Sequence, residues 1–460
     1  MPSIRATWES DSSTPSMPIL ERYYPLIEKS IASFNKAQDT GSFEPAFNLP
    51  PLDDAMRRFL APASARFVEL GQYEQLPLRL LDLRQNPATQ NTNTFASTLI
   101  AARAVQHIRR TGESLLLFSP SSGNKAIALR DAVERALKAG LVDAAQLRIA
   151  TLTPRHTLHK MRSGALSENP ELRVLNPVFV LDHPVPEQVK QVGLAFKSLY
   201  SRNSGRRQPR LWHSLNLANY QFADQARAFF DHEFGSAADV QRKTLHAHAV
   251  SSAYGLLGYQ AGLNTLKSRG EPVSTPAYLL VQHLATSDMV RHLLTGNFDR
   301  QAIPAYHQNE RGIWRQFRDP HFPLNAWDPE EVLEPTLYTH HPATAARMSA
   351  LIRAQGGSGI VVSLLECIER YGQCRTLLDP VGIRLPADPR ELREWSLVMG
   401  MTGLLNAIDR GLIGDVDGCT LHASGSYANT DYRAIPHAHV IPVTNAGHML
   451  DLLLSDSDAG

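Results

Sequence analysis

The chain has 460 residues, of which 43% are hydrophobic and 20% are charged, and its formal net charge is +1. This length allows two or three domains with large cores, and the near-neutral charge argues against nucleic acid or an anionic membrane as a partner. The three cysteines are too few and too scattered for a disulfide framework, and no apolar run is long enough to span a membrane. We therefore expect a cytoplasmic protein.

The chain begins with helical patterns. Apolar positions recur with helical spacing from Ile19 to Phe34 and again from Leu52 to Leu60, with a proline-rich break between them. We therefore assign residues 1–75 to an N-terminal helical extension.

Short strand-like segments alternate with long helical segments from about residue 76 to residue 200. The predicted strands are Leu78–Leu81, Leu115–Phe118, Leu147–Ala150 and Val178–Leu181, and the predicted helices are Thr98–Arg110 and Ala126–Ala139. Such alternation is typical of parallel βαβ units. We assign residues 76–205 to a smaller, mobile α/β lobe and interpret the basic stretch 201–210 as an exposed linker between lobes.

A second α/β region follows, and we assign residues 206–440 to a larger lobe and residues 441–460 to a C-terminal tail. Its predicted elements are a helix at Phe222–Phe230, strands at Tyr278–Val281, Thr336–Tyr338 and Gly359–Val362, and a helix that begins near Asp288. Residues 296–332 are rich in proline, asparagine, aromatic and charged residues, so we interpret them as an insertion.

A turn of small residues carries the strongest chemical signal. The segment Ser119–Ala126 follows the apolar strand Leu115–Phe118 and opens a long helical pattern. The free backbone N–H groups and the dipole of a helix N-terminus favour an anion there. An ordinary Ser/Gly turn that caps a helix is the alternative.

This turn has a companion segment upstream, Thr94-Phe95-Ala96-Ser97, about thirty residues before Ser122-Gly123-Asn124. The order and spacing resemble the pyridoxal-phosphate (PLP) enzymes of fold type II, most closely threonine synthase and cysteate synthase. In that family a Thr/Ser-Phe-Lys-Asp/Ser run supplies the Schiff-base lysine. The resemblance extends from about residue 69 to residue 427 and includes Glu69–Leu78, which is similar to the family's Leu-Gly-Glu-Gly-x-Thr-Pro-Leu.

The resemblance implies a two-lobed α/β fold of the tryptophan-synthase-β type, with mainly parallel sheets flanked by helices. It also implies PLP as the cofactor, held between the lobes, a small-molecule amino acid as the substrate, and a homodimer. We expect neither nucleic acid nor a membrane as a partner.

The resemblance places Ala96 at the Schiff-base lysine, with Ser97 beside it as a catalytic residue. A lysine holds PLP as an imine and then moves the α-proton of the substrate, and alanine can do neither. Either a lysine was replaced on purpose to trap a ligand, or a natural member of the family lost covalent catalysis. Lys125 is a candidate replacement amine, although a first-turn lysine that points to solvent is the simpler interpretation.

Other site residues of the smaller lobe follow from the resemblance. Asn124 resembles the asparagine that hydrogen-bonds the phenolic oxygen of PLP, and an amide can do so without adding charge. The turn of Ser121, Ser122 and Gly123 would bind the substrate carboxylate, together with Thr94. Asn216 lies in a segment similar to the family's Ser-Ile/Val-Asn loop, which faces the cleft.

In the larger lobe, the strand Tyr278–Val281 leads to the position of the phosphate-binding loop, which we assign to Ala285, Thr286 and Ser287. The glycines of the family are missing there and Asp288 follows, so a plain capped helix is the alternative. Ser424 would meet the pyridine nitrogen, and Tyr427 would contact the substrate. A neutral serine leaves that nitrogen unprotonated, which favours elimination and replacement over transamination.

The implied reaction is a β- or γ-elimination or replacement on an activated amino acid, such as an O-acyl- or O-phospho-serine or homoserine, in amino-acid or specialised metabolism. Ala96 should impair it. The alternative is a pseudoenzyme with the same fold that binds a ligand or a partner. The pairs His246/His248, His340/His341 and His437/His439 lack the spacing of zinc sites, so we expect core or solvated histidines.

Overall fold

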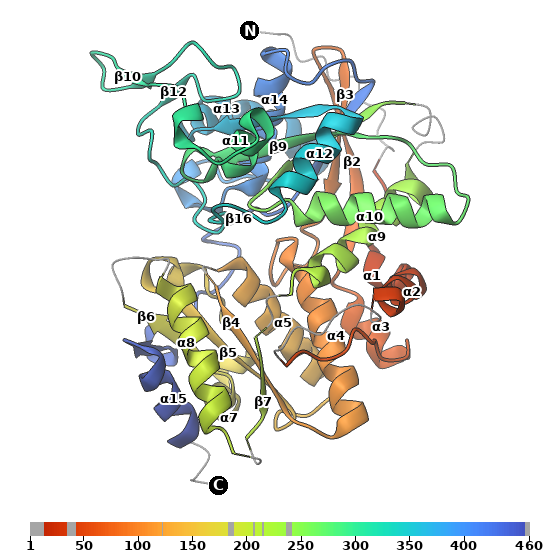
Figure 1. Cartoon of the computed structure of the whole chain (residues 1–460), viewed down its shortest axis with the longest axis vertical. Helices are drawn as coiled ribbons and strands as arrows, with labels where there is room; N and C mark the ends of the chain where they lie inside the picture. Colours follow the sequence, from red (N-terminus) through yellow and green to blue (C-terminus); the bar gives the residue numbers. More distant parts are fainter. Residues whose placement is uncertain are drawn as a thin grey trace. The chain divides into compact units, whose positions relative to one another are not determined.

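A computed structural model describes residues 13–34, 43–121, 123–182, 188–205, 208–213, 216–235 and 242–455. The chain divides into two compact units (Figure 1). Unit 1 contains the N-terminal residues up to Met17 with Ser64–Gln85 and Asp224–Asn429, and unit 2 contains Pro18–Ala63, Asn86–Ala223 and the chain from Thr430 onward. Each unit is built on a mainly parallel sheet flanked by helices, which confirms the predicted α/β fold class.

Unit 2 is built on a five-stranded sheet whose pairings are all parallel. The strand order is β17 (Ile441–Val443), β6 (Val178–Leu181), β5 (Leu147–Pro154), β4 (Leu115–Pro120) and β7 (Arg210–His213). Every residue of β4 is buried, as expected for a central parallel strand covered on both faces. Because the strands are parallel, their carboxyl ends meet at one edge of the sheet.

Helices cover both faces of this sheet. The helices of unit 2 are α1 (Ile19–Arg22), α2 (Tyr24–Phe34), α3 (Asp54–Leu60), α4 (Asn93–Thr111), α5 (Asn124–Lys138), η1 (Arg155–Lys160), α6 (Ala165–Glu168), α7 (Pro170–Leu175), α8 (Gln188–Asn203), η7 (His437–His439) and α15 (Ala446–Ser455). Phe118 and Phe179 pack with Phe196 of α8 and Met449 of α15. The alternate residue Val178 packs with Ile127 of α5, so α5 covers the opposite face.

Unit 1 contains a seven-stranded sheet. The strand order is β1 (Met17–Pro18), β2 (Ser64–Tyr73), β3 (Leu76–Asp82), β15 (Gly418–Ala423), β8 (Thr244–Ala249), β9 (Ala277–His283) and β13 (Gly357–Val362). The strands β2 and β3 form an antiparallel hairpin, and the pairings from β3 to β13 are parallel.

Helices again lie on both faces, and short strands form two small sheets. The remaining elements are α9 (Ala218–Phe234), whose residues from Asp224 belong to unit 1, α10 (Tyr254–Ser268), η3 (Leu284–Thr286), α11 (Asp288–Thr295), η4 (Arg300–Ala302), β10 (His307–Gln308), β11 (Trp314–Arg315), β12 (Asn325–Ala326), α12 (Ala345–Gln355), α13 (Leu364–Leu378), η5 (Asp379–Val381), η6 (Pro389–Glu391), β14 (Leu392–Glu394), α14 (Ser396–Asp409) and β16 (Tyr427–Ala428). Leu279 packs with Leu405 of α14, and Leu280 packs with Met348 of α12 on the other face. The predicted insertion 296–332 holds β10, β11 and β12.

Several predicted boundaries are wrong. Residues 64–73 form strand β2 instead of part of a helical extension, and its partner β3 is in the same unit. The segment 201–210 runs from α8 into β7 within unit 2, so it does not link the units. Residues 441–455 are not a tail, because β17 extends the sheet and α15 buries Met449 in the core.

Two further differences concern local structure. No strand forms at 336–338, because the carboxylate of Glu334 accepts hydrogen bonds from Thr336 N at 3.0 Å and Thr336 Oγ1 at 2.8 Å and turns the chain. The helix expected from Thr98 begins at Asn93, so Ala96 lies inside its first turn. None of the helices in the described ranges is long and apolar enough to cross a membrane.

We predict that Gly193→Ala destabilises the protein by about 1–3 kcal/mol, because the new Cβ would overpack a tight contact. Gly193 lies in α8, and a Cβ there would lie 2.8 Å from Cβ of Pro120 in β4. Urea unfolding measures the change in free energy. As a control, Gly372→Ala in α13 meets nothing within 4 Å and should stabilise the protein by about 0.5–1 kcal/mol. A neutral or stabilising Gly193→Ala would contradict this packing.

Candidate functional site

Two helices of unit 2 begin at the carboxyl edge of its sheet. The helix α5 follows the carboxyl end of β4 directly, and α4 ends at Thr111, just before β4 starts. Because α4 and α5 pack against each other and both run opposite to β4, their first turns lie at the same edge. Ligands of open parallel sheets bind at this edge, where helix N-termini present free N–H groups. It contains Ala96, Ser97, Asn124 and Lys125 in the two first turns.

The turn before α5 depends on a glycine. Gly123 has φ +150° and ψ −87°, a conformation that residues with a side chain rarely adopt. The backbone N–H of Ser121 donates to Leu152 O at 2.9 Å, and the Gly123 N–H donates to Ser121 Oγ at 3.3 Å. The turn is therefore held close to β5. Ser122, also predicted to bind substrate, lies outside the described residues.

The position expected for the Schiff-base lysine is closed. Ala96 is 1% exposed and Ser97 is 0% exposed in the first turn of α4. The hydroxyl of Thr94 is engaged with Thr89 Oγ1 at 2.5 Å and with Asn86 Nδ2 at 3.3 Å. By contrast, Ser97 Oγ is buried without a hydrogen-bond partner among the described residues.

Other buried polar atoms of the same sheet also lack partners in the described part of the chain. They are Ser119 Oγ of β4, Thr151 Oγ1 of β5 and His213 Nε2 of β7. Ser119 and Thr151 are paired in register and both are 0% exposed. A buried polar group without a partner costs about 1–3 kcal/mol, so several at one edge indicate a place that a polar ligand or water completes.

Lys125 does not simply point into solvent. Its side chain is only partly exposed, and burial lowers the pKa of its ammonium group to about 8. Burial, together with the positive charges of Lys125 and Lys197, lowers the pKa of His213 to about 3. The His213 imidazole is therefore neutral, and the charge of Lys125 is close enough to lower its pKa.

The two predicted asparagines differ in their surroundings. Asn124 is 7% exposed at the start of α5. Asn216 already uses its amide at the start of α9, where Nδ2 donates to Glu44 Oε2 at 2.7 Å and Oδ1 accepts from Ala218 N at 2.9 Å. These contacts give Asn216 a structural task that the sequence did not indicate.

In unit 1, the predicted phosphate loop lies between β9 and α11. The hydroxyl of Thr286 donates to Leu337 O at 2.7 Å, so it is engaged within the protein. Ser287 precedes α11 without capping it, and its Oγ is buried with no partner in the described ranges. Ala285, the third predicted residue, lies in the 3₁₀ turn η3.

Asp288 is the charged group of this loop. Its carboxylate is 0% exposed, pairs with Arg291 at 2.9 Å and accepts from His341 N at 3.0 Å. Burial opposes ionisation, but the His341 N–H and the Arg291 charge outweigh it and lower the pKa of Asp288. The loop therefore contains an ionised carboxylate whose charge Arg291 balances.

The remaining predicted residues of unit 1 follow β15. Ser424 Oγ is buried and has no hydrogen-bond partner among the residues described. Tyr427, in β16, is 1% exposed. Ser287 and Ser424 thus share with Ser97 the property of a buried hydroxyl that the described chain does not satisfy.

The buried histidines of unit 1 form a polar core that the sequence only partly indicated. His246 Nδ1 lies 2.9 Å from His422 Nε2, and His248 Nε2 lies 3.1 Å from a guanidinium nitrogen of Arg227. Burial, followed by the Arg227 charge, lowers the pKa of His248 to about 3. His246, His248 and His422 are buried in the core, as expected for His246 and His248. Within the described ranges no cluster of His, Cys, Asp or Glu is arranged to hold a metal.

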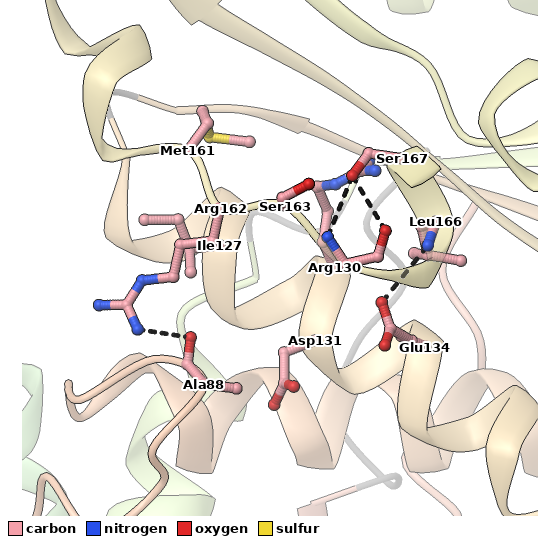
Figure 2. Close-up of a pocket in the computed structure, with 11 residues that line it drawn as sticks. Ala88, Ile127, Arg130, Asp131, Glu134, Met161, Arg162, Ser163, Leu166 and Ser167 are labelled. Carbon is pink, nitrogen blue, oxygen red and sulfur yellow. Dashed lines mark hydrogen bonds between the residues drawn. The ribbon is translucent and has the colours of Figure 1, made fainter. Parts of the chain in front are cut away.

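A separate pocket lies along α5 in unit 2 (Figure 2). It is lined by Ala88, Ile127, Arg130, Asp131, Glu134, Met161, Arg162, Ser163, Gly164, Leu166 and Ser167. Its charged groups already have partners: Arg162 donates to Ala88 O at 2.7 Å, Arg130 donates to Asn176 O at 2.8 Å and Glu134 accepts from Leu166 N. None of the predicted site residues lines this pocket, so we place the candidate site elsewhere.

We predict that Asp288→Asn destabilises the protein by about 3–5 kcal/mol at pH 7, because it leaves the buried Arg291 without a counter-charge. The pKa of Asp288 in the folded chain is below the ordinary value of an aspartate, so its stabilising effect is fully present above that ordinary value and is lost as the pH falls through the folded pKa. The difference in the free energy of unfolding between Asp288→Asn and the native chain should therefore become smaller at acidic pH. Urea unfolding at several pH values measures this difference in the free energy of unfolding, with Asp415→Asn at an exposed position as the control that changes little.

Comparisons with known proteins agree with this architecture. Threonine synthase from yeast aligns with a TM-score of 0.52 at 11% identity, covering 86% of this chain and 80% of that chain. Threonine synthase from Escherichia coli aligns with a TM-score of 0.53 at 12% identity, covering 94% of this chain and 88% of that chain. The PLP-bound threonine synthase from Brucella melitensis aligns with a TM-score of 0.50 at 13% identity, covering 93% of this chain and 84% of that chain. At these identities the likeness shows the fold, which is the predicted two-lobed fold of type-II PLP enzymes.

Sequence comparison gives the family without an activity. No curated protein matches the sequence. A family model described as "Family of unknown function (DUF6002)" matches residues 16–457, which is nearly the whole chain. The chain is therefore a member of the DUF6002 family.

Proposed function

We propose that this protein binds PLP and catalyses a β- or γ-elimination or replacement on an activated amino acid. One observation carries the proposal. Ser97, Ser287 and Ser424 occupy predicted catalytic or cofactor positions, and each has a buried hydroxyl without a partner among the described residues. The fold shared with threonine synthases, one of which is PLP-bound, supports the same choice of cofactor.

The residues of unit 1 fit the two ends of PLP unequally. Ser424 Oγ, which has no hydrogen-bond partner in the described ranges, could donate to a pyridine nitrogen, and as a neutral donor it would leave that nitrogen unprotonated. At the phosphate end, Thr286 is engaged with Leu337 O, so Ser287 Oγ and the N–H groups at the start of α11 remain as donors. The Asp288 carboxylate nearby is balanced by Arg291, which limits its repulsion of a phosphate.

The residues of unit 2 would handle the substrate. PLP, when bound, supplies an electron sink for bond cleavage at the α-carbon of an amino acid. The turn at Ser121 and Gly123 leads into α5, whose first backbone N–H groups would orient the substrate carboxylate, and Asn124 would donate to the phenolic oxygen of the cofactor without adding charge. The proposal includes a cytoplasmic homodimer and a small-molecule amino acid as the partner, and a specific relation to cysteate synthase remains a prediction.

A second function is favoured by one observation. Ala96 is 1% exposed and offers no amine at the position that the resemblance gives to the Schiff-base lysine. A PLP-fold pseudoenzyme that binds a ligand without turning it over would need no amine there. Release of a keto acid or of a leaving group from O-acetyl-serine or O-phospho-homoserine in the presence of PLP distinguishes the two functions.

We predict that Ser424→Ala weakens PLP binding about fivefold, because one hydrogen bond of about 1 kcal/mol is lost. Equilibrium dialysis with PLP measures the dissociation constant. Unfolding in urea should show no loss of stability, since this hydroxyl has no partner in the described chain. The control is Ser268→Ala, whose exposed hydroxyl donates to Thr265 O. A native chain that does not bind PLP would refute the proposed function.

A further inference from the structure

We propose that Lys125 Nζ is the amine that captures an aldehyde ligand as an imine at the carboxyl edge of the sheet in unit 2. The inference rests on the proposed function, with PLP as the aldehyde, and names the amine that Ala96 does not supply. The inference places the imine-forming amine in the first turn of α5, whereas the resemblance places it in the first turn of α4.

The position of Lys125 supports this role. It comes two residues after Gly123, whose backbone conformation fixes the turn between β4 and α5. The carboxyl edge of this sheet also contains Ser97 Oγ, Ser119 Oγ and His213 Nε2, which are buried and have no hydrogen-bond partner among the residues that the structure describes. Hydroxyl and imidazole groups of this kind can hydrogen-bond the oxygen atoms of a carbonyl ligand and of the adduct that precedes the imine.

The protonation of Lys125 fits a nucleophile. An amine attacks a carbonyl only when it is neutral, and burial lowers the pKa of Lys125 to about 8. About a tenth of the side chains are then neutral at pH 7, whereas an ordinary lysine, with a pKa of about 10.4, is almost wholly protonated. The residue as a whole is partly exposed at the start of α5.

The chemical step is balanced without any oxidant or reductant. The nitrogen of neutral Lys125 forms a bond to the aldehyde carbon, and the carbonyl oxygen leaves as water with the two protons of the amine. An amino-acid substrate would displace Lys125 from this imine. The substrate nitrogen forms the new bond to the imine carbon, the bond from that carbon to Lys125 Nζ breaks, and the two protons of the substrate amine pass to Lys125. The released amine is then placed to accept a proton.

The test traps the imine chemically. The full-length chain is incubated with PLP at pH 7 and reduced with borohydride, and the modified lysines are mapped by peptide mass spectrometry. The sequence has nine lysines, so each can be followed. We expect Lys125 to be labelled at least about tenfold more than Lys138, which lies exposed on the same helix and pairs with Glu134.

Two variants keep the test specific. Lys125→Arg retains the positive charge but cannot form a stable imine, and it should lose the adduct. Lys138→Ala should retain labelling of Lys125. Urea unfolding checks that both variants fold. Labelling spread evenly over the surface lysines would overturn the inference.

Equilibrium dialysis with PLP, run in parallel, separates this inference from the proposed function. If PLP is retained by the native chain and no adduct forms at Lys125, the inference is wrong while the proposed cofactor stands. If PLP is not retained, both are wrong. Retention together with a Lys125 adduct supports both, and the Lys125→Arg variant should then still retain PLP, though more weakly.

Discussion

The parallel pairing of β4 with β5 and β7 is the constraint on which the candidate site of unit 2 depends. Parallel strands require helical crossovers, so each helix returns across the sheet and the next strand starts again at the same end. As a result, α4 and α5 both begin at the carboxyl edge. Residues about thirty positions apart in the sequence, Ala96 and Lys125, are thereby placed in neighbouring first turns.

The buried polar groups of the two units fall into two kinds. Some, such as Asn216 and Thr286, use their side chains to hold the chain in place, and their contacts account for their burial without a ligand. Others, such as Ser97, Ser287 and Ser424, have buried hydroxyls that the described chain leaves unsatisfied. Since unsatisfied burial is costly, the second kind supports the proposal that a ligand or water binds at these positions, whereas the first kind is explained by contacts within the chain.

The relation between Ala96 and Lys125 gives the site its chemical interest. Ala96, buried in the first turn of α4, offers no amine, and Lys125 in the neighbouring helix has an ammonium group whose pKa burial lowers to about 8. Both residues lie at the carboxyl edge of the sheet in unit 2.

The sequence by itself determined the α/β class and the order of most strands and helices, because periodicity and turn residues are local properties. The roles of Ser97, Ser287 and Ser424 are implied by the resemblance and stay predictions. Only the tertiary structure decided that 441–455 completes unit 2, since the pairing of β17 with β6 joins residues distant in the chain. The same holds for the sharing of the Asn216 amide with Glu44. It also holds for Lys125, because burial by surrounding elements, which no local pattern encodes, sets the pKa of its side chain.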